Sequence, residues 1–216
     1  MKKLLLHSCC GPCLSSVYIT TTENFAVTPF WFNPNIENKK EYIKRFDSFK
    51  SLITQFAKYI CHSESPGDEE SNQRSFAYTQ DDRKGSDDKT NGVNRYYIEN
   101  ENWQKEIKGL ENEPEGGKRC QKCIKFRLEK TAKEAKNNNF NIFATTLSIS
   151  PHKDAAMINK IGRKLAKKYQ IEFYRADFKK NDGYKKSVEL SKKISLYRQN
   201  YCGCRYSIGK IVNHEI

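Results

Sequence analysis

Short apolar runs rich in β-branched and aromatic residues alternate with amphipathic segments along most of this chain, and this alternation constrains the fold most. The expected strands are Lys3–His7, Phe25–Phe32, Phe140–Ile149 and Ile171–Ala176. The expected helices are Leu14–Thr22, Glu37–Ile60, Lys118–Lys136, a segment from Ser150-Pro151 through Tyr169, and Tyr184–Leu196. Alternating strands and helices predict right-handed crossovers and a parallel sheet with helices on both faces, an α/β fold.

Two helices carry specific expectations. In Glu37–Ile60 the apolar residues recur at steps of three and four and form one face. They are Ile43, Phe46, Phe49, Ile53, Phe56 and Ile60. Cys61 closes this face and is expected in the core. Ser150, followed by Pro151, is expected to cap the helix that runs to Tyr169.

The domain organisation is expected to be simple, with residues 1–216 forming a single α/β catalytic domain. From about 62 to 102 the composition turns to Gly, Ser, Asp, Asn and Gln with no helical or strand period, which predicts a peripheral, mobile insertion. No run approaches 18 consecutive apolar residues, so a membrane span is not expected. The apolar run Leu4–Leu6 is too short for a secretory signal, and a cytoplasmic location is expected.

Positive charge is concentrated in the second half of the chain. The segment Lys118–Ile216 holds 24 basic and 8 acidic residues, which accounts for more than the net charge of +13 of the whole chain. A field of this sign attracts polyanions, and nucleic acid is the commonest polyanion in a cell. A solvated, lysine-rich surface would give the same count.

The eight cysteines fall into three tight groups and one single residue. The groups are Cys9, Cys10 and Cys13; Cys120 and Cys123; and Cys202 and Cys204, with Cys61 alone. Clustered cysteines in a cytosolic chain indicate metal or redox chemistry more often than structural disulfides. Cys9 and Cys10 follow the first strand and Ser148–Lys153 follows the third, so both segments are expected at the edge where parallel sheets bind ligands.

Cys9 and Cys10 together with Cys120 and Cys123 offer four soft ligands. Both pairs are expected at helix starts, where backbone N–H groups favour the thiolate. Neighbouring side chains diverge, which suits an iron–sulfur cluster better than one zinc ion, although spacing alone leaves zinc and redox dithiols open. Cys10-Gly11-Pro12-Cys13 matches the active-site tetrapeptide of thioredoxins, so a thioredoxin-like dithiol oxidoreductase is an alternative.

Cys202-Gly203-Cys204 is a different kind of pair, because a disulfide across one residue is strained and easily reduced. Such a pair relays electrons or provides two metal ligands. Weaker candidates are Lys153 as a phosphate-binding group at a helix start, Asp177 as a metal ligand or turn cap, and Tyr201 as a base-stacking platform.

Four separated motifs together resemble the QueH-type epoxyqueuosine reductases. These motifs are His7-Ser8-Cys9-Cys10-Gly11-Pro12-Cys13, Glu113-Pro114-Glu115-Gly116-Gly117-Lys118-Arg119-Cys120, Thr146-Leu147-Ser148-Ile149-Ser150-Pro151 and Tyr197-Arg198-Gln199-Asn200-Tyr201-Cys202-Gly203-Cys204. They occur in the same order as in that family and cover nearly the whole chain except the polar segment after His62.

The resemblance implies reduction of epoxyqueuosine to queuosine at the wobble position of tRNA, the last step of queuosine biosynthesis. It implies a fold like the adenine nucleotide α-hydrolase (HUP-type) domain, and a [4Fe–4S] cluster held by Cys9, Cys10, Cys120 and Cys123. Cys202 and Cys204 would form the redox-active pair, able to close a disulfide, or would bind an additional iron. The role of Cys13 stays open. The implied partners are tRNA and an unidentified electron donor.

Two further alternatives remain. One is a non-enzymatic, zinc-stabilised RNA-binding module. The other is an ATP-using tRNA enzyme of the same fold, although Cys9–Cys13 stands where a Gly-rich phosphate loop is expected.

Overall fold

The computed structural model describes the backbone of residues 1–63 and 100–208, and side chains for 1–56 and 100–208. The Cys61 side chain and most of the segment at about 62–102 therefore lie outside the described residues. In the described part of the chain, no helix combines the length and the apolar character needed to cross a membrane.

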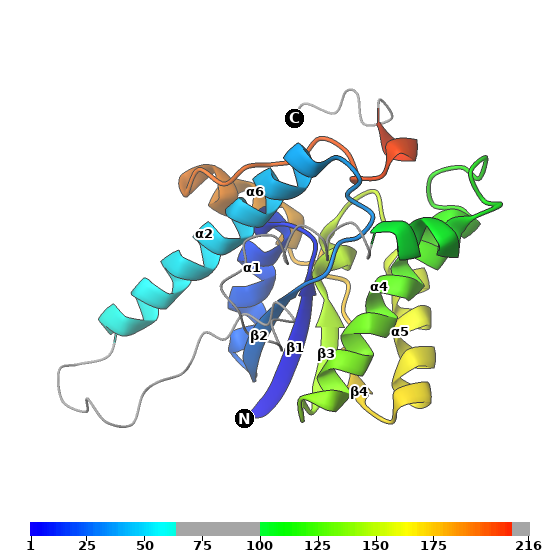
Figure 1. The fold of residues 1–216 in the computed structure, drawn as a ribbon. Helices are drawn as coiled ribbons and strands as arrows, with labels where there is room; N and C mark the ends of the chain where they lie inside the picture. Colours follow the sequence, from blue (N-terminus) through cyan, green and yellow to red (C-terminus); the bar gives the residue numbers. More distant parts are fainter. Residues whose placement is uncertain (64–99, 209–216) are drawn as a thin grey trace, which may run out of the picture.

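Four parallel strands form the sheet, in the order β2-β1-β3-β4 (Figure 1). They are β1 (Lys2–Ser8), β2 (Phe25–Trp31), β3 (Ile142–Thr145) and β4 (Glu172–Phe173). The predicted parallel α/β sheet is confirmed.

Helices cover both faces of this sheet (Figure 1). On one face lie α1 (Gly11–Thr22), α2 (Lys39–Ser63) and α6 (Gly183–Lys193), and on the other lie α4 (Lys118–Asn137) and α5 (Ala155–Tyr169). Residues 100–107 are also helical, and two short 3₁₀ helices, η1 (Thr146–Ile149) and η2 (Arg205–Ser207), follow β3 and the last cysteines.

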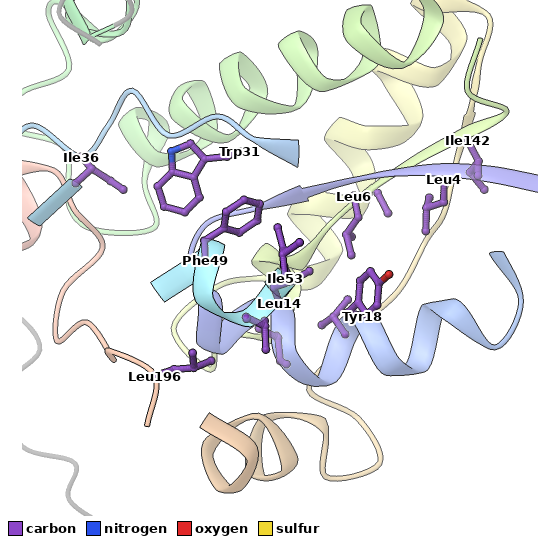
Figure 2. Packing of buried hydrophobic residues seen from close by; sticks show 14 residues of the cluster. Leu4, Leu6, Leu14, Tyr18, Trp31, Ile36, Phe49, Ile53, Ile142 and Leu196 are labelled. Atoms are coloured by element: carbon purple, nitrogen blue, oxygen red, sulfur yellow. The ribbon is translucent and has the colours of Figure 1, made fainter. Parts of the chain in front are cut away.

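The central strand β1 divides the core in two, because successive side chains of a strand point to opposite faces. Leu4 and Leu6 join the cluster under α1 and α2, whereas Leu5 joins the cluster under α4 and α5. Figure 2 shows the first cluster, with Phe49 of α2 beside Trp31 at a ring-centroid distance of 5.1 Å.

The segment between β3 and α5 differs from the prediction. The strand expected over Phe140–Ile149 ends at Thr145, because the Thr145 hydroxyl accepts a hydrogen bond from Leu147 N–H and turns the chain into η1. Ser150 does not cap a long helix. Asp154 does so, since its carboxylate accepts from Ala156 N–H (2.8 Å) and Met157 N–H (3.2 Å).

Two other expectations need correction. The last strand is only Glu172–Phe173 instead of Ile171–Ala176. On α2, Ile43 is 46% exposed, because Tyr42 takes the inward position and accepts a hydrogen bond from the Trp31 indole N–H (2.9 Å). Phe49 and Ile53 are buried as predicted.

Candidate metal and redox site

The first thiol group lies where β1 ends, beside the end of β3. Cys9 follows β1, and its Sγ lies 3.7 Å from Oγ1 of Thr146, the first residue after β3. The strands are parallel neighbours, so their carboxyl ends meet at one edge. The predicted placement of Cys9 at this edge is confirmed.

Cys13 joins this group. The Sγ atoms of Cys9, Cys10 and Cys13 all lie within 4.8 Å of one another, and no other such group of three potential metal ligands occurs in the described part of the chain. Cys10 caps α1, and its sulfur accepts hydrogen bonds from Cys13 N–H (3.2 Å) and Gln199 Nε2 (3.1 Å). These three thiols could hold one metal ion, or two of them could serve a larger cluster.

Only one of these thiols is acidic. Hydrogen bonds from Cys10 and Cys13 hold the pKa of Cys9 well below its usual range. Burial raises the pKa of Cys10 to about 12, although Cys10 caps a helix. The expectation that a helix start would lower this thiol pKa is therefore wrong, because desolvation outweighs the helix dipole.

A second thiol group lines a small pocket of about 30 Å³. Its walls are Asn35, Trp103, Arg119, Cys120, Cys123, Ile124, Arg127, Lys153, Cys202 and Cys204. Cys120 and Cys123 come from the first turns of α4, and the other two thiols come from the segment after α6. The fold thus brings the second and third cysteine groups of the sequence together.

The start of α4 is fixed by a turn around Arg119. The Arg119 guanidinium donates to the backbone carbonyls of Leu110 (3.3 Å), Glu111 (2.9 Å) and Glu113. The Glu113 carboxylate accepts from the N–H of Lys118, the first residue of the helix (3.0 Å). These hydrogen bonds fix the start of α4, and Cys120 and Cys123 in its first turns line the pocket.

The Cys202-Gly203-Cys204 loop is held by α2. Arg45, only 2% exposed, donates from Nη1 to the Cys202 carbonyl (3.1 Å) and from Nη2 to the Tyr201 carbonyl (3.0 Å). Glu41 pairs with Arg45 Nε at 2.6 Å and accepts from the Tyr197 hydroxyl at 2.6 Å. This buried network sets the position of the loop relative to the sheet.

Replacing Gly203 by alanine should disrupt this loop. Gly203 has a φ of +117°, and an added Cβ would lie 2.9 Å from Ile36 Cγ1 and 3.3 Å from Arg45 Nη1. We expect the free energy of unfolding, measured by denaturant titration, to fall by about 2–4 kcal/mol from backbone strain plus overpacking.

The matched control is Gly109→Ala. Gly109 also has a positive φ (+81°), but nothing lies within 4 Å of its added Cβ. It should lose only about 1 kcal/mol from strain. Equal losses in the two variants would show that the packing around Gly203 does not hold the loop.

Lys153 directly precedes Asp154, the N-cap of α5, and its side chain contacts Cys202. Its Nζ lies 3.3 Å from Cys202 Sγ. Burial raises the pKa of the Cys202 thiol, but the charges of Lys153 and Arg127 outweigh burial and lower it overall. The same contact raises the pKa of Lys153. The ammonium of Lys153 therefore lies beside the Cys202 thiol and favours its thiolate form.

Lys153→Met is expected to slow alkylation of Cys202 by iodoacetamide several-fold near neutral pH. Removing the ammonium raises the pKa of Cys202, so less thiolate is present and the alkylation profile moves to higher pH. Peptide mass spectrometry of the alkylated protein measures the rate at this residue. Lys160→Met is the control, because Lys160 is an exposed residue of α5 and does not line the pocket. An unchanged profile in Lys153→Met would contradict the pairing.

Two other thiols of the pocket, Cys123 and Cys204, have raised pKa values. Burial raises the pKa of Cys123, and burial together with the charge of Cys202 raises the pKa of Cys204 to about 11. The expectation of a lowered pKa at the start of α4 is therefore wrong for Cys123. The pair Cys202 and Cys204 combines an acidic thiol with a weakly acidic one.

His7, beside the first thiol group, is a structural residue. Its Nε2–H donates to the Phe32 carbonyl (3.0 Å) and its Nδ1 accepts from the Thr145 hydroxyl (2.9 Å). Burial, reinforced by the charge of Arg127, lowers its pKa to about 4. Both ring nitrogens are therefore used, and no position is left for a metal.

Two weaker candidates already have partners. The Tyr201 ring lies against Arg45, 5.1 Å from its guanidinium carbon. Asp177 pairs with Lys179 at 2.9 Å and accepts from Lys179 N–H, the arrangement of a turn cap. The described contacts of Asp177 include no thiol.

Arg45 and Arg127 were not predicted from sequence. Glu41 and Arg45, at i and i+4, have the spacing of a surface ion pair, and only the fold brings the carbonyl of Cys202 to them. Arg127 stands four residues after Cys123, on the same face of α4. That spacing was the available sequence clue to its place in the pocket.

The described cysteines are free thiols: Cys9, Cys10, Cys13, Cys120, Cys123, Cys202 and Cys204. The chain matches the family model described as "Epoxyqueuosine reductase QueH" over residues 4–210.

Curated relatives carry the same description as this family model. The chain is 34% identical over 208 residues to an epoxyqueuosine reductase QueH of Streptococcus pyogenes, covering 94% of this chain and 69% of the relative. It is 32% identical over 209 residues to the protein of that name from Thermotoga maritima, covering 96% and 91% of the two chains. A match over nearly the whole length, through all three cysteine groups, shows that this chain belongs to the QueH family.

Proposed function

We propose that this chain reduces epoxyqueuosine to queuosine at the wobble position of tRNA, the last step of queuosine biosynthesis. Its relatives are named for epoxyqueuosine reduction. The observation that carries the proposal is the pocket in which four thiols from two segments meet three cations, Arg119, Arg127 and Lys153. Whole-chain membership of this family removes the basis for a thioredoxin-like enzyme, which was a match of only four residues.

The residues supply the ligand chemistry of the iron–sulfur cluster that the family resemblance implies, from two places: Cys9 and Cys10 at the end of β1, and Cys120 and Cys123 in the pocket wall. Thiolates are the ligands such clusters use, and the proposed set is Cys9, Cys10, Cys120 and Cys123. Buried N–H groups without partners among the described residues also surround the pocket, namely Trp103 Nε1, Arg119 Nε and Arg127 Nε. Such donors suit the sulfur atoms of a cluster. A [4Fe–4S] cluster bound there would supply single-electron transfer.

The pair Cys202 and Cys204 would supply the two electrons of the reaction. An epoxide and a dithiol give an alkene, a disulfide and water; when Cys202 is ionised, the oxygen takes one proton from the Cys204 thiol and the second from the ammonium of Lys153. The low pKa of Cys202 and the high pKa of Cys204 give one thiolate and one proton donor. The ammonium of Lys153 stands at Cys202 Sγ and can deliver a proton to the departing oxygen. An unidentified electron donor would then reduce the disulfide.

The same two residues could instead bind an additional iron, with Asp177 as a further ligand. The free thiols are compatible with either arrangement, and the dithiol is favoured by the unequal pKa values. Cys13, within 4.8 Å of Cys9 and Cys10, is a candidate alternative ligand in the cluster.

Wider features of the proposal concern fold and partners. The parallel sheet with two helical layers is compatible with a HUP-like domain spanning residues 1–216, in which the polar segment at about 62–102 is an insertion. The excess positive charge of Lys118–Ile216 would bind tRNA phosphates. A cytoplasmic site of action follows from the tRNA substrate and the free thiols.

The test begins with protein purified without oxygen. We expect a brown protein containing roughly four irons and four sulfides per chain. With a chemical reductant it should convert epoxyqueuosine to queuosine in tRNA, measured by nucleoside mass spectrometry as the loss of one oxygen atom. More than four irons per chain would indicate that Cys202 and Cys204 bind a second metal. A colourless protein that holds zinc, gains no iron on reconstitution and leaves tRNA unchanged would overturn the proposal in favour of a zinc-stabilised RNA-binding module.

A further inference from the structure

Arg127 is a buried cation in the middle of the thiol site. It projects from α4 one turn after Cys123 and lines the pocket. Its side chain is 2% exposed and is among the largest fully or nearly fully buried side chains described. A guanidinium in this position has lost almost all of its hydration, which is costly unless other charges replace the water.

No carboxylate in the described part of the chain pairs with Arg127. Its Nε is buried without a hydrogen-bond partner. The neighbouring Arg119 contrasts with it, because three backbone carbonyls accept from that guanidinium. Arg119 Nε is also without a partner, but Arg119 Nη1 donates to backbone carbonyls, whereas the Arg127 guanidinium has no such acceptor among the described residues.

Cysteines are the groups that can bring negative charge to the pocket lined by Arg127. The pocket wall contains no acidic residue but four cysteines, Cys120, Cys123, Cys202 and Cys204. A single guanidinium therefore faces the thiols of α4 and those of the segment after α6.

We propose that Arg127 is the counter-cation of the metal site, a positioning residue that stabilises the ionised, metal-bound cysteines and destabilises the metal-free fold. Cysteines that keep their protons offer the guanidinium no negative charge. When a metal replaces their protons, the site becomes negative and the charges compensate. This inference rests on the proposed metal site but not on the identity of the metal or on the tRNA reaction.

Zinc alone is the probe for the test, with Arg127→Met, which has similar length and no charge. We expect the zinc affinity, measured by competition with a chromophoric chelator, to fall about 10–100-fold, as for residues that support metal ligands. The melting temperature of the metal-free variant should equal or exceed that of the parent protein, because an unpaired buried charge is removed. Arg127→Lys, which keeps the charge, should recover part of the affinity.

Leu128→Ala is the matched control. Leu128 is the next residue of α4, has no exposed surface and does not line the pocket. It should lower the melting temperature of the metal-free and zinc-bound proteins alike. The inference is overturned if Arg127→Met behaves like Leu128→Ala, or if its zinc affinity is unchanged.

A redox measurement on reconstituted protein gives an independent readout. Removing a positive charge disfavours the reduced, more negative form of a cluster, so Arg127→Met should lower its midpoint potential. An unchanged or higher potential would overturn the inference. If no cluster can be reconstituted in the parent protein, the proposed function fails, while the zinc experiment still decides the role of Arg127.

Discussion

Replacing Cys202 by serine is expected to abolish turnover while leaving the iron and sulfide content of the protein unchanged. A serine hydroxyl cannot form a disulfide with Cys204 and is not ionised beside Lys153, so the two electrons of the pair are lost. Conversion of epoxyqueuosine in tRNA, measured by nucleoside mass spectrometry, should fall by a factor of roughly 10³ or more, as when an enzyme nucleophile is removed.

Ser207→Ala provides the control for Cys202→Ser. It removes the hydroxyl 3.6 Å from Cys204 Sγ but keeps both thiols, so turnover should stay close to that of the parent. A fully active Cys202→Ser variant would show that Cys202 and Cys204 do not act as a redox pair. Loss of iron together with activity would identify Cys202 as a metal ligand instead.

Cys120→Ala is expected to lose the cluster and all activity. In the metal-free protein this sulfur is partly exposed and accepts one hydrogen bond, from Gly116 N–H at 3.3 Å. The free energy of unfolding of the metal-free protein should therefore change by no more than about 1 kcal/mol. Iron and sulfide analysis after anaerobic reconstitution, together with denaturant titration of the metal-free protein, measures the two effects separately.

Gln121→Ala controls for the position on α4. Gln121 is the exposed neighbour of Cys120 on the same helical turn, and its replacement should leave iron content and activity intact. A Cys120→Ala protein that still binds the parent amount of iron would show that Cys13, and not Cys120, completes the ligand set.

The order of strands and helices was predictable because each element is set by local pattern. Leu4, Leu5 and Leu6 can be buried together only in a strand covered on both faces. The ends of elements were less predictable, because they depend on single side chain to backbone hydrogen bonds. Thr145 ends β3 by bonding Leu147 N–H, and Asp154 rather than Ser150 captures the free N–H groups of α5.

The site was predictable to the level of its cysteine groups. The spacing of the cysteines in the sequence indicates which thiols belong to one local group. It does not indicate which of the three groups lie close together in the folded protein. Lys153 contacts a thiol 49 positions away, and burial rather than helix position decides the pKa of Cys10 and Cys123. Such properties come from tertiary packing, and no local pattern reports them.

The hydrogen bonds from Arg45 of α2 to the carbonyls of Tyr201 and Cys202 have a consequence for the synthesis of the protein. Arg45 holds the carbonyl of a residue 157 positions later, and the thiols of the site extend from Cys9 to Cys204. At about 5–20 residues per second, the ribosome adds Cys204 roughly 10–40 s after Cys9. During that interval the early thiols have neither their later partners nor the loop that closes the pocket. The proposed cluster ligands are complete once Cys123 has been made, but the pocket wall is complete only when Cys202 and Cys204 reach α2, so we expect the finished site to form after synthesis of the last cysteines.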